Sequence, residues 1–223
     1  TGADGVTTTQ EMTALGVPFG QDSLSSHRNQ IRFRVQDMAG NTGTSPAYNV
    51  DIDTAPPNNP TNLGGDRDTE TWSNDPQATM AWTGASDSSS GVYGYSYVWS
   101  TTPTLLPNNS VDTTNTSVAT TISDDGQDWY FHVRARDLAG NWASTATHQG
   151  PYWLDASPPA SPSTIEGLLH TPGQWSALDV VTVQWSGGSD SNGSGIAGYS
   201  YAWDHNPTTL PDGTIDTTMT SAN

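Results

Sequence analysis

The chain has 223 residues, and its 23 acidic and six basic side chains leave a formal net charge of −17, so nucleic acid and anionic membrane surfaces are not expected partners. It contains no cysteine, which excludes disulfides, thiolate zinc sites and cysteine nucleophiles. No apolar run reaches the roughly 18 residues of a membrane span, so we expect no membrane insertion in this segment.

The first predicted strand covers residues 31–36, and a short hairpin loop follows it. Apolar and cationic residues alternate in this strand, with Ile31, Phe33 and Val35 on one face and Arg32 and Arg34 on the other. The alternation predicts that the apolar face turns inward and the arginines turn outward. The next residues, 37–41 (DMAGN), supply an aspartate that bonds nearby backbone and a glycine for a positive φ.

A proline-rich linker comes next, at residues 53–60 (DTAPPNNP), and it predicts a semi-rigid, extended spacer. Both this linker and the preceding loop return roughly a hundred residues later, as residues 155–162 (DASPPASP) and 137–141 (DLAGN). The chain is therefore expected to contain a tandem repeat.

The front part of the repeat is also present twice. Residues 72–82 match residues 175–185, with a tryptophan at both ends, and GYSYVW at 94–99 recurs as GYSYAW at 198–203. These matches divide the chain into the back half of a repeat (1–56), a complete unit (57–158) and the front half of a repeat (159–223).

The complete unit contains short strands with alternating patterns and no helical periodicity, which predicts an all-β fold. The buried faces of three of its strands are expected to be formed by Ala78, Met80 and Trp82, then by Tyr95, Tyr97 and Trp99, and then by Phe131, Val133 and Ala135. In the last strand, the intervening His132, Arg134 and Arg136 are expected to face outward, with the arginines packed along aromatic rings of a neighbouring strand.

The repeat unit has short strands in about 100 residues, tryptophans on consecutive strands, and the motifs GYSYxW and DxAGN before a Pro-Pro linker. In these features it resembles the tandem immunoglobulin-like or fibronectin type III-like β-sandwiches of large bacterial and archaeal surface proteins. The resemblance implies an extracellular or cell-surface location. It also implies a structural role in a stalk, surface layer or filament, with neighbouring copies or repeats as partners. The alternative is an adhesin or a glycan-binding accessory module, for which Trp142 and Trp153 are the first residues to test.

Acidic residues from separate loops are expected to meet at the junctions between repeats. Asp53 lies in the linker, Asp87 in the loop between two strands, and Asp137 and Asn141 in the hairpin loop at the same end of the sandwich. Asp155 and Asp190 are the corresponding pair at the next junction. Carboxylate and amide oxygens are ligands for Ca²⁺, but aspartates of this kind also form turns without any metal, and both interpretations are open.

The sequence predicts no enzyme and no catalytic residue. The five histidines, His27, His132, His148, His170 and His205, belong to no recognisable metal or catalytic motif and are interpreted as isolated surface residues.

Two interpretations of the half-repeats are open. An incomplete sandwich exposes an apolar face and unpaired strand edges. Either the missing halves belong to a longer chain, or the front half of one subunit completes the back half of the next and builds a filament.

Overall fold

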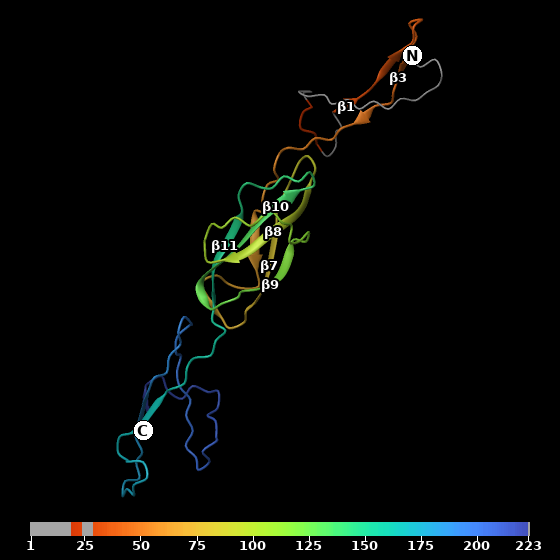
Figure 1. The fold of residues 1–223 in the computed structure, drawn as a ribbon. Helices are drawn as coiled ribbons and strands as arrows, with labels where there is room; N and C mark the ends of the chain where they lie inside the picture. The colour runs from red at the N-terminus through yellow and green to blue at the C-terminus, as the bar shows by residue number, and fades with distance from the viewer. Residues whose placement is uncertain (1–18, 24–28, 223) are drawn as a thin grey trace.

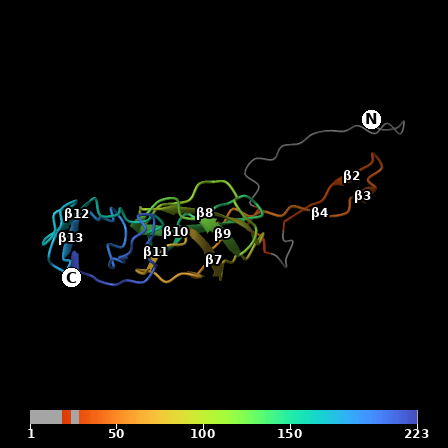
Figure 2. The ribbon, with the colours of Figure 1, turned by 90° about the horizontal axis from the view of Figure 1, so that it is seen from below.

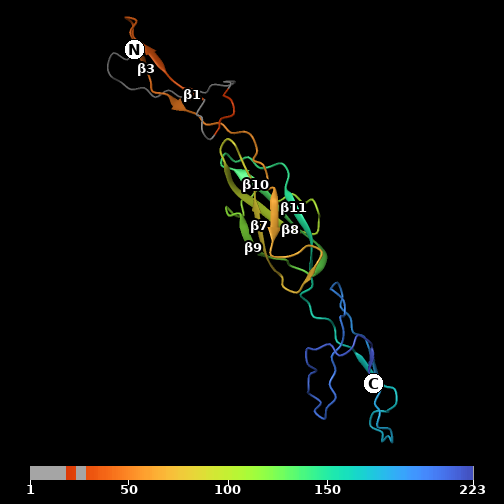
Figure 3. The same cartoon turned by 180° about the vertical axis from the view of Figure 1, so that it is seen from behind.

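The computed structural model describes residues 19–23 and 29–222, which form strands joined by turns and loops, and this confirms the predicted all-β class. The described residues follow one line, from an amino-terminal segment through a central unit (residues 57–158) to a carboxy-terminal segment (residues 159–222) (Figure 1). Views from below and from behind show the same order (Figure 2, Figure 3). None of the described residues belongs to a helix that is long and apolar enough to cross a membrane.

The central unit is built from seven strands in two sheets. One sheet has the order β5-β7-β9 and the other the order β6-β11-β10-β8. Neighbouring strands are antiparallel except β6 and β11, which pair in parallel. The strands are β5 (Asn62–Gly65), β6 (Trp72–Ser73), β7 (Gln77–Thr83), β8 (Val92–Ser100), β9 (Ser117–Thr121), β10 (Gly126–Asp137) and β11 (Thr147–Leu154).

The two sheets share one apolar core, to which strands of both contribute. In β7, Ala78, Met80 and Trp82 are buried and the residues between them are exposed, as the alternation predicted. The Trp82 ring contacts the opposite sheet, with its centroid 5.2 Å from that of Tyr95 and 6.1 Å from that of Phe131. Full burial of a side chain the size of Phe131 contributes roughly 1.5–3 kcal/mol to the free energy of unfolding.

The register between β8 and β10 aligns the apolar faces of the two strands. Phe131 lies opposite Trp99, and Val133 lies opposite Tyr97. The Trp99 ring also packs edge-on against Tyr152 of β11, with centroids 5.3 Å apart. The core is therefore closed by β10 and β11.

The polar face of β10 differs from the prediction that its histidine and arginines face solvent. His132 is completely buried and Arg134 is only 5% exposed. Arg134 donates a hydrogen bond to Asn109, and its guanidinium lies 4.8 Å from the centroid of the Trp142 ring. Residues from the loop between β8 and β9 and from the loop between β10 and β11 therefore cover this face of β10. The predicted packing of arginine on aromatic rings is confirmed here, and also for Arg136, which lies over Tyr93.

The amino-terminal segment forms two small two-stranded sheets, β1-β4 and β2-β3. Its strands are β1 (Gln30–Ile31), β2 (Arg34–Gln36), β3 (Thr42–Thr44) and β4 (Tyr48–Asn49). The predicted inward face is wrong for this segment, because Phe33 is 60% exposed and Val35 is 71% exposed. These are the positions that correspond to the buried Val133 and Ala135, and among the described residues they have no facing sheet.

The carboxy-terminal segment forms one sheet of order β12-β13-β14, with β12 (Thr164–Gly167), β13 (Val183–Ser186) and β14 (Ser221–Ala222). Its Trp185 and Tyr199 rings lie 5.3 Å apart at 70°, which repeats the 5.2 Å and 71° of Trp82 and Tyr95. Tyr201 and Trp203, however, are 40% and 57% exposed.

Candidate functional site

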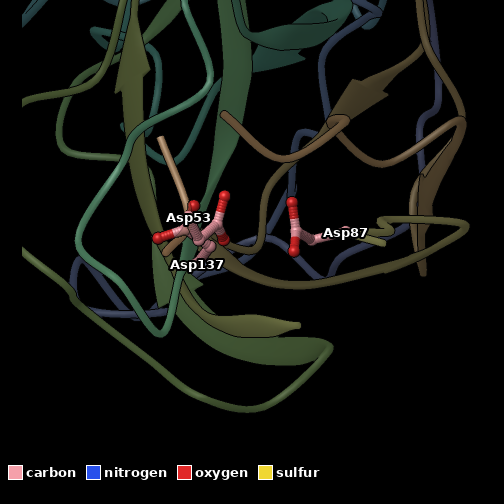
Figure 4. Close-up of side chains that lie close together, drawn as sticks. All are labelled: Asp53, Asp87 and Asp137. Carbon is pink, nitrogen blue, oxygen red and sulfur yellow. The ribbon is translucent and has the colours of Figure 1, made fainter. Parts of the chain in front are cut away.

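Three aspartates from three separate segments meet where the linker enters the central unit. Asp53 belongs to the linker, Asp87 to the loop between β7 and β8, and Asp137 is the last residue of β10. One carboxylate oxygen of each lies within 4.8 Å of the others (Figure 4). Asp137 is completely buried, and the other two are half-buried. The structure therefore brings together the three acids whose convergence the repeat pattern suggested.

Asp137 shapes the hairpin loop that follows β10. Its Oδ1 accepts hydrogen bonds from the backbone N–H groups of Gly140 and Asn141, each at 2.7 Å, and its Oδ2 accepts one from the Asn141 side chain at 2.8 Å. Gly140 has a φ of 106°, a region that glycine tolerates best. Three N–H donors thus compensate the buried charge, and the predicted loop chemistry is present.

Asn141 connects this loop to the linker. Its side-chain nitrogen also lies 3.1 Å from the carbonyl oxygen of Asp53 and 3.3 Å from that of Ala55, and it donates to both. Asn141 was predicted as an oxygen ligand for a metal. In the structure its nitrogen, and not its oxygen, faces the linker and Asp137, so here it acts as a hydrogen-bond donor.

Asp53 is bonded from both sides of the junction. Its Oδ2 accepts hydrogen bonds from the backbone and the hydroxyl of Ser90, and its Oδ1 accepts from the Gln21 side chain and from the backbone of Ala55. Partial burial acts to raise the pKa of Asp53, but the hydrogen bonds from Ser90 and Gln21 outweigh this and hold the pKa below its ordinary value. The linker carboxylate is therefore ionised at neutral pH.

Asp87 caps its own loop. Its Oδ1 accepts backbone hydrogen bonds from Ser89, Ser90 and Gly91, each at 2.9 Å. Beside these loops lies an open cavity of about 370 Å³, whose acidic lining consists of Asp22, Asp51 and Asp53. The arrangement is compatible with turn formation and with Ca²⁺ binding, because each acid accepts hydrogen bonds within its own loop and all three still converge on one point.

The second junction repeats part of this arrangement. Asp155 accepts hydrogen bonds from the backbone and hydroxyl of Ser194, at 2.7 and 2.6 Å, as Asp53 does from Ser90. Asp190 accepts one from the backbone of Gly195 at 2.7 Å. Both carboxylates crowd Gly193, since a Cβ built there would lie 2.6 Å from an Asp190 oxygen and 2.8 Å from Oδ1 of Asp155. The predicted pair of acids thus lies together at this junction too.

Two histidines form a contact that the sequence did not suggest. His132 of β10 lies directly opposite His148 of β11, and their Nδ1 atoms are 2.6 Å apart. The Nε2 atom of His132 lies 3.1 Å from the hydroxyl of Ser100. Burial, together with the neighbouring His148, lowers the pKa of His132 to about 4, and burial also lowers the pKa of His148. The interpretation of the two as isolated residues is therefore wrong, and only His148 lies at the surface.

The remaining predicted residues take packing positions. Trp142 lies under the guanidinium of Arg134, and Trp153 packs against Trp72 with ring centroids 5.5 Å apart. His170 donates a hydrogen bond from Nε2–H to the carbonyl oxygen of Val180, at 2.8 Å. His27 lies outside the described residues.

No protein-family model matches the chain, and no curated protein sequence is similar to it.

Proposed function

We propose that the chain is a spacer region of tandem immunoglobulin-like repeats in an extracellular stalk, surface-layer or filament protein. The observation that carries this proposal is the recurrence of the junction: Asp53 with Ser90 and Asp155 with Ser194 make the same pair of hydrogen bonds at the two ends of the central unit. Each pair of bonds ties a linker to the unit that follows it, and proline-rich linkers add stiffness. Regular spacing is what a stalk or filament requires.

The junction bonds give the proposal a direct test in solution. In the double variant Ser90→Ala, Asn141→Ala, the linker loses three side-chain hydrogen bonds from the central unit. We therefore expect a wider distribution of intramolecular pair distances in small-angle X-ray scattering. Ser110→Ala, an exposed serine away from both junctions, is the matched control. Identical scattering curves for the wild type and the double variant would remove the stiff-spacer role.

We also propose that Ca²⁺ binds at Asp53, Asp87 and Asp137 and stiffens the first junction. Three carboxylates within 4.8 Å repel one another, and a hard cation with oxygen ligands would turn that repulsion into attraction. The corresponding Asp155 and Asp190 would contribute to a site of the same kind. Asp155 supports this, because its Oδ1 is buried with no hydrogen-bond partner.

The proposed partner is a neighbouring copy or repeat of the same protein. In the central unit, Phe131 and Tyr152 cover the Trp99 ring, whereas the corresponding Trp203 lines an open, mainly apolar cleft of about 500 Å³. A strand pair of the β10–β11 type would cover this cleft and supply the missing half of the repeat. Such a pair can come from the same polypeptide or from another subunit.

An adhesin or glycan-binding module is the second candidate, and the same cleft is the observation that favours it. Exposed tyrosine and tryptophan rings such as Tyr201 and Trp203 can stack on sugar faces. Binding of the chain to a glycan array, and its loss in Trp203→Ala, would support this function over the spacer role.

A further inference from the structure

We propose that His132 and His148 form a binding site for a borderline divalent transition cation of the class of Cu²⁺, Ni²⁺ and Zn²⁺. Imidazole nitrogen is a preferred ligand of these cations and a poor ligand of Ca²⁺. The histidine pair lies within the central unit, so it is independent of how neighbouring repeats are joined.

The strand register supplies the two ligands in a fixed arrangement. His132 and His148 are direct partners across the β10–β11 ladder, and their rings lie 4.9 Å apart at an angle of 72°. Both rings direct Nδ1 toward the other ring. A cation bound by both nitrogens would therefore be chelated by two strands that the backbone already holds together, and little conformational entropy would be lost on binding.

The distance between the nitrogens fits coordination at adjacent ligand positions. With metal–nitrogen distances of about 2.0–2.1 Å, a right angle at the metal needs about 2.9 Å between the nitrogens. The observed separation is 2.6 Å, so the nitrogens must move apart by a few tenths of an ångström, and the His148 ring must turn until both lone pairs point at the metal. His148 is exposed and can make this movement, and water can supply the remaining ligands from the same side.

Ser100 holds His132 in the tautomer that a metal ligand needs. The Ser100 hydroxyl donates its only proton to the carbonyl oxygen of Thr102 at 3.1 Å, so it accepts a hydrogen bond from Nε2–H of His132. Nδ1 of His132 is then left with a free lone pair, which accepts the proton of His148 Nδ1 when no metal is bound. A ligating histidine that donates its other nitrogen to a fixed acceptor is the usual arrangement around protein-bound metals.

Metal binding then requires only one proton to move. His148 must exchange its Nδ1–H tautomer for the Nε2–H tautomer, and because this residue is exposed, water can carry the proton between the two nitrogens.

Titration of the full chain with Cu²⁺ tests the site, in excess Ca²⁺ so that carboxylates are occupied. We expect one site per chain by calorimetry and an electron paramagnetic resonance spectrum with two equatorial nitrogens. His148→Ala should weaken binding by at least ~10-fold, and Ser100→Ala should weaken it by roughly 10-fold through loss of the tautomer lock. His205→Ala, an exposed histidine of the carboxy-terminal segment, is the matched control and should bind like the wild type.

Near-ultraviolet circular dichroism checks that His148→Ala keeps the packed core, and His148→Gln provides a second variant that retains a polar side chain of similar length. Unchanged Cu²⁺ affinity in a folded His148 variant would overturn the site, as would a spectrum with a single nitrogen ligand. Loss of binding in His205→Ala but not in the His148 variants would assign the copper to the other segment.

Discussion

The central unit and the carboxy-terminal segment start from nearly the same motifs and reach different degrees of burial. Trp82 and Tyr95 contact each other in the same geometry as Trp185 and Tyr199. Beyond that contact the two regions diverge, because Trp203 is 57% exposed where its counterpart Trp99 packs on Phe131. The contact between tryptophan and tyrosine therefore forms in both regions, whereas only the central unit has strands that also cover its second tryptophan.

The largest effect is expected from Phe131→Ala, which removes the ring that β10 contributes to the core. Because Phe131 is completely buried, the free energy of unfolding of the central unit should fall by ~3–5 kcal/mol. Chemical denaturation followed by tryptophan fluorescence measures it. Phe33→Ala is the matched variant in the amino-terminal segment, and its exposed ring should change stability by less than ~0.5 kcal/mol. Equal losses in the two variants would contradict the difference in burial.

Asp137→Ala should have the next largest effect, since it leaves the backbone N–H groups of Gly140 and Asn141 without an acceptor and removes one of the three acceptors of the Asn141 side chain. We expect a loss of about 1–3 kcal/mol in chelator-treated protein, measured by thermal unfolding. Asp37 accepts the two corresponding hydrogen bonds from Asn41 and one from the backbone of Ala39 in the exposed amino-terminal hairpin, where water can replace the carboxylate. Asp37→Ala should therefore cost less than Asp137→Ala, and the reverse order would refute the role of burial.

Calcium should sharpen the comparison between the two junctions. At a Ca²⁺ concentration tenfold above the dissociation constant, the central unit should gain about 1.4 kcal/mol, seen as a higher melting temperature that chelation reverses. Asp87→Asn should abolish this gain because it removes one of three converging charges. Asp190→Asn lies at the other junction and should leave most of it. An identical melting temperature with Ca²⁺ and with chelator would exclude the metal.

The smallest effect is expected at the arginines. Arg134→Lys keeps the charge but loses the planar contact with Trp142 and the hydrogen bond to Asn109, and should cost about 1 kcal/mol. Arg34→Lys is the corresponding exposed substitution in the amino-terminal segment and should be nearly neutral in the same unfolding experiment. A neutral Arg134→Lys would mean that the covered face of β10 adds little stability.

Features that depend on a few neighbouring residues could be predicted from the sequence. The alternation in 77–82 determined which side chains face the core, and the DLAGN motif determined the hairpin around Asp137. The meeting of Asp53, Asp87 and Asp137 was also foreseeable, because the loops of a two-sheet fold meet at its ends. The Ca²⁺ site, the repeat arrangement and the family resemblance stay predictions.

Features that depend on distant loops were not predictable in the same way. The periodicity of β10 is the same whether or not its polar face is covered, so it could not reveal that His132 and Arg134 are buried. The pairing of His132 with His148 depends on the register across the connection between β10 and β11, residues 138–146, which no local pattern specifies. For the same reason, the alternation of Phe33 and Val35 could not show that both are exposed.

The parallel pairing of β6 and β11 has a consequence for a chain under tension. Trp72 pairs with Trp153 and Ser73 with Leu154, so a strand near the start of the central unit is hydrogen-bonded alongside its last strand. The two linkers leave the unit at opposite ends (Figure 1). A pulling force along the chain would therefore load these bonds in shear, and they would have to break together rather than one after another. The short contact between two tryptophan-bearing strands would act as a mechanical clamp.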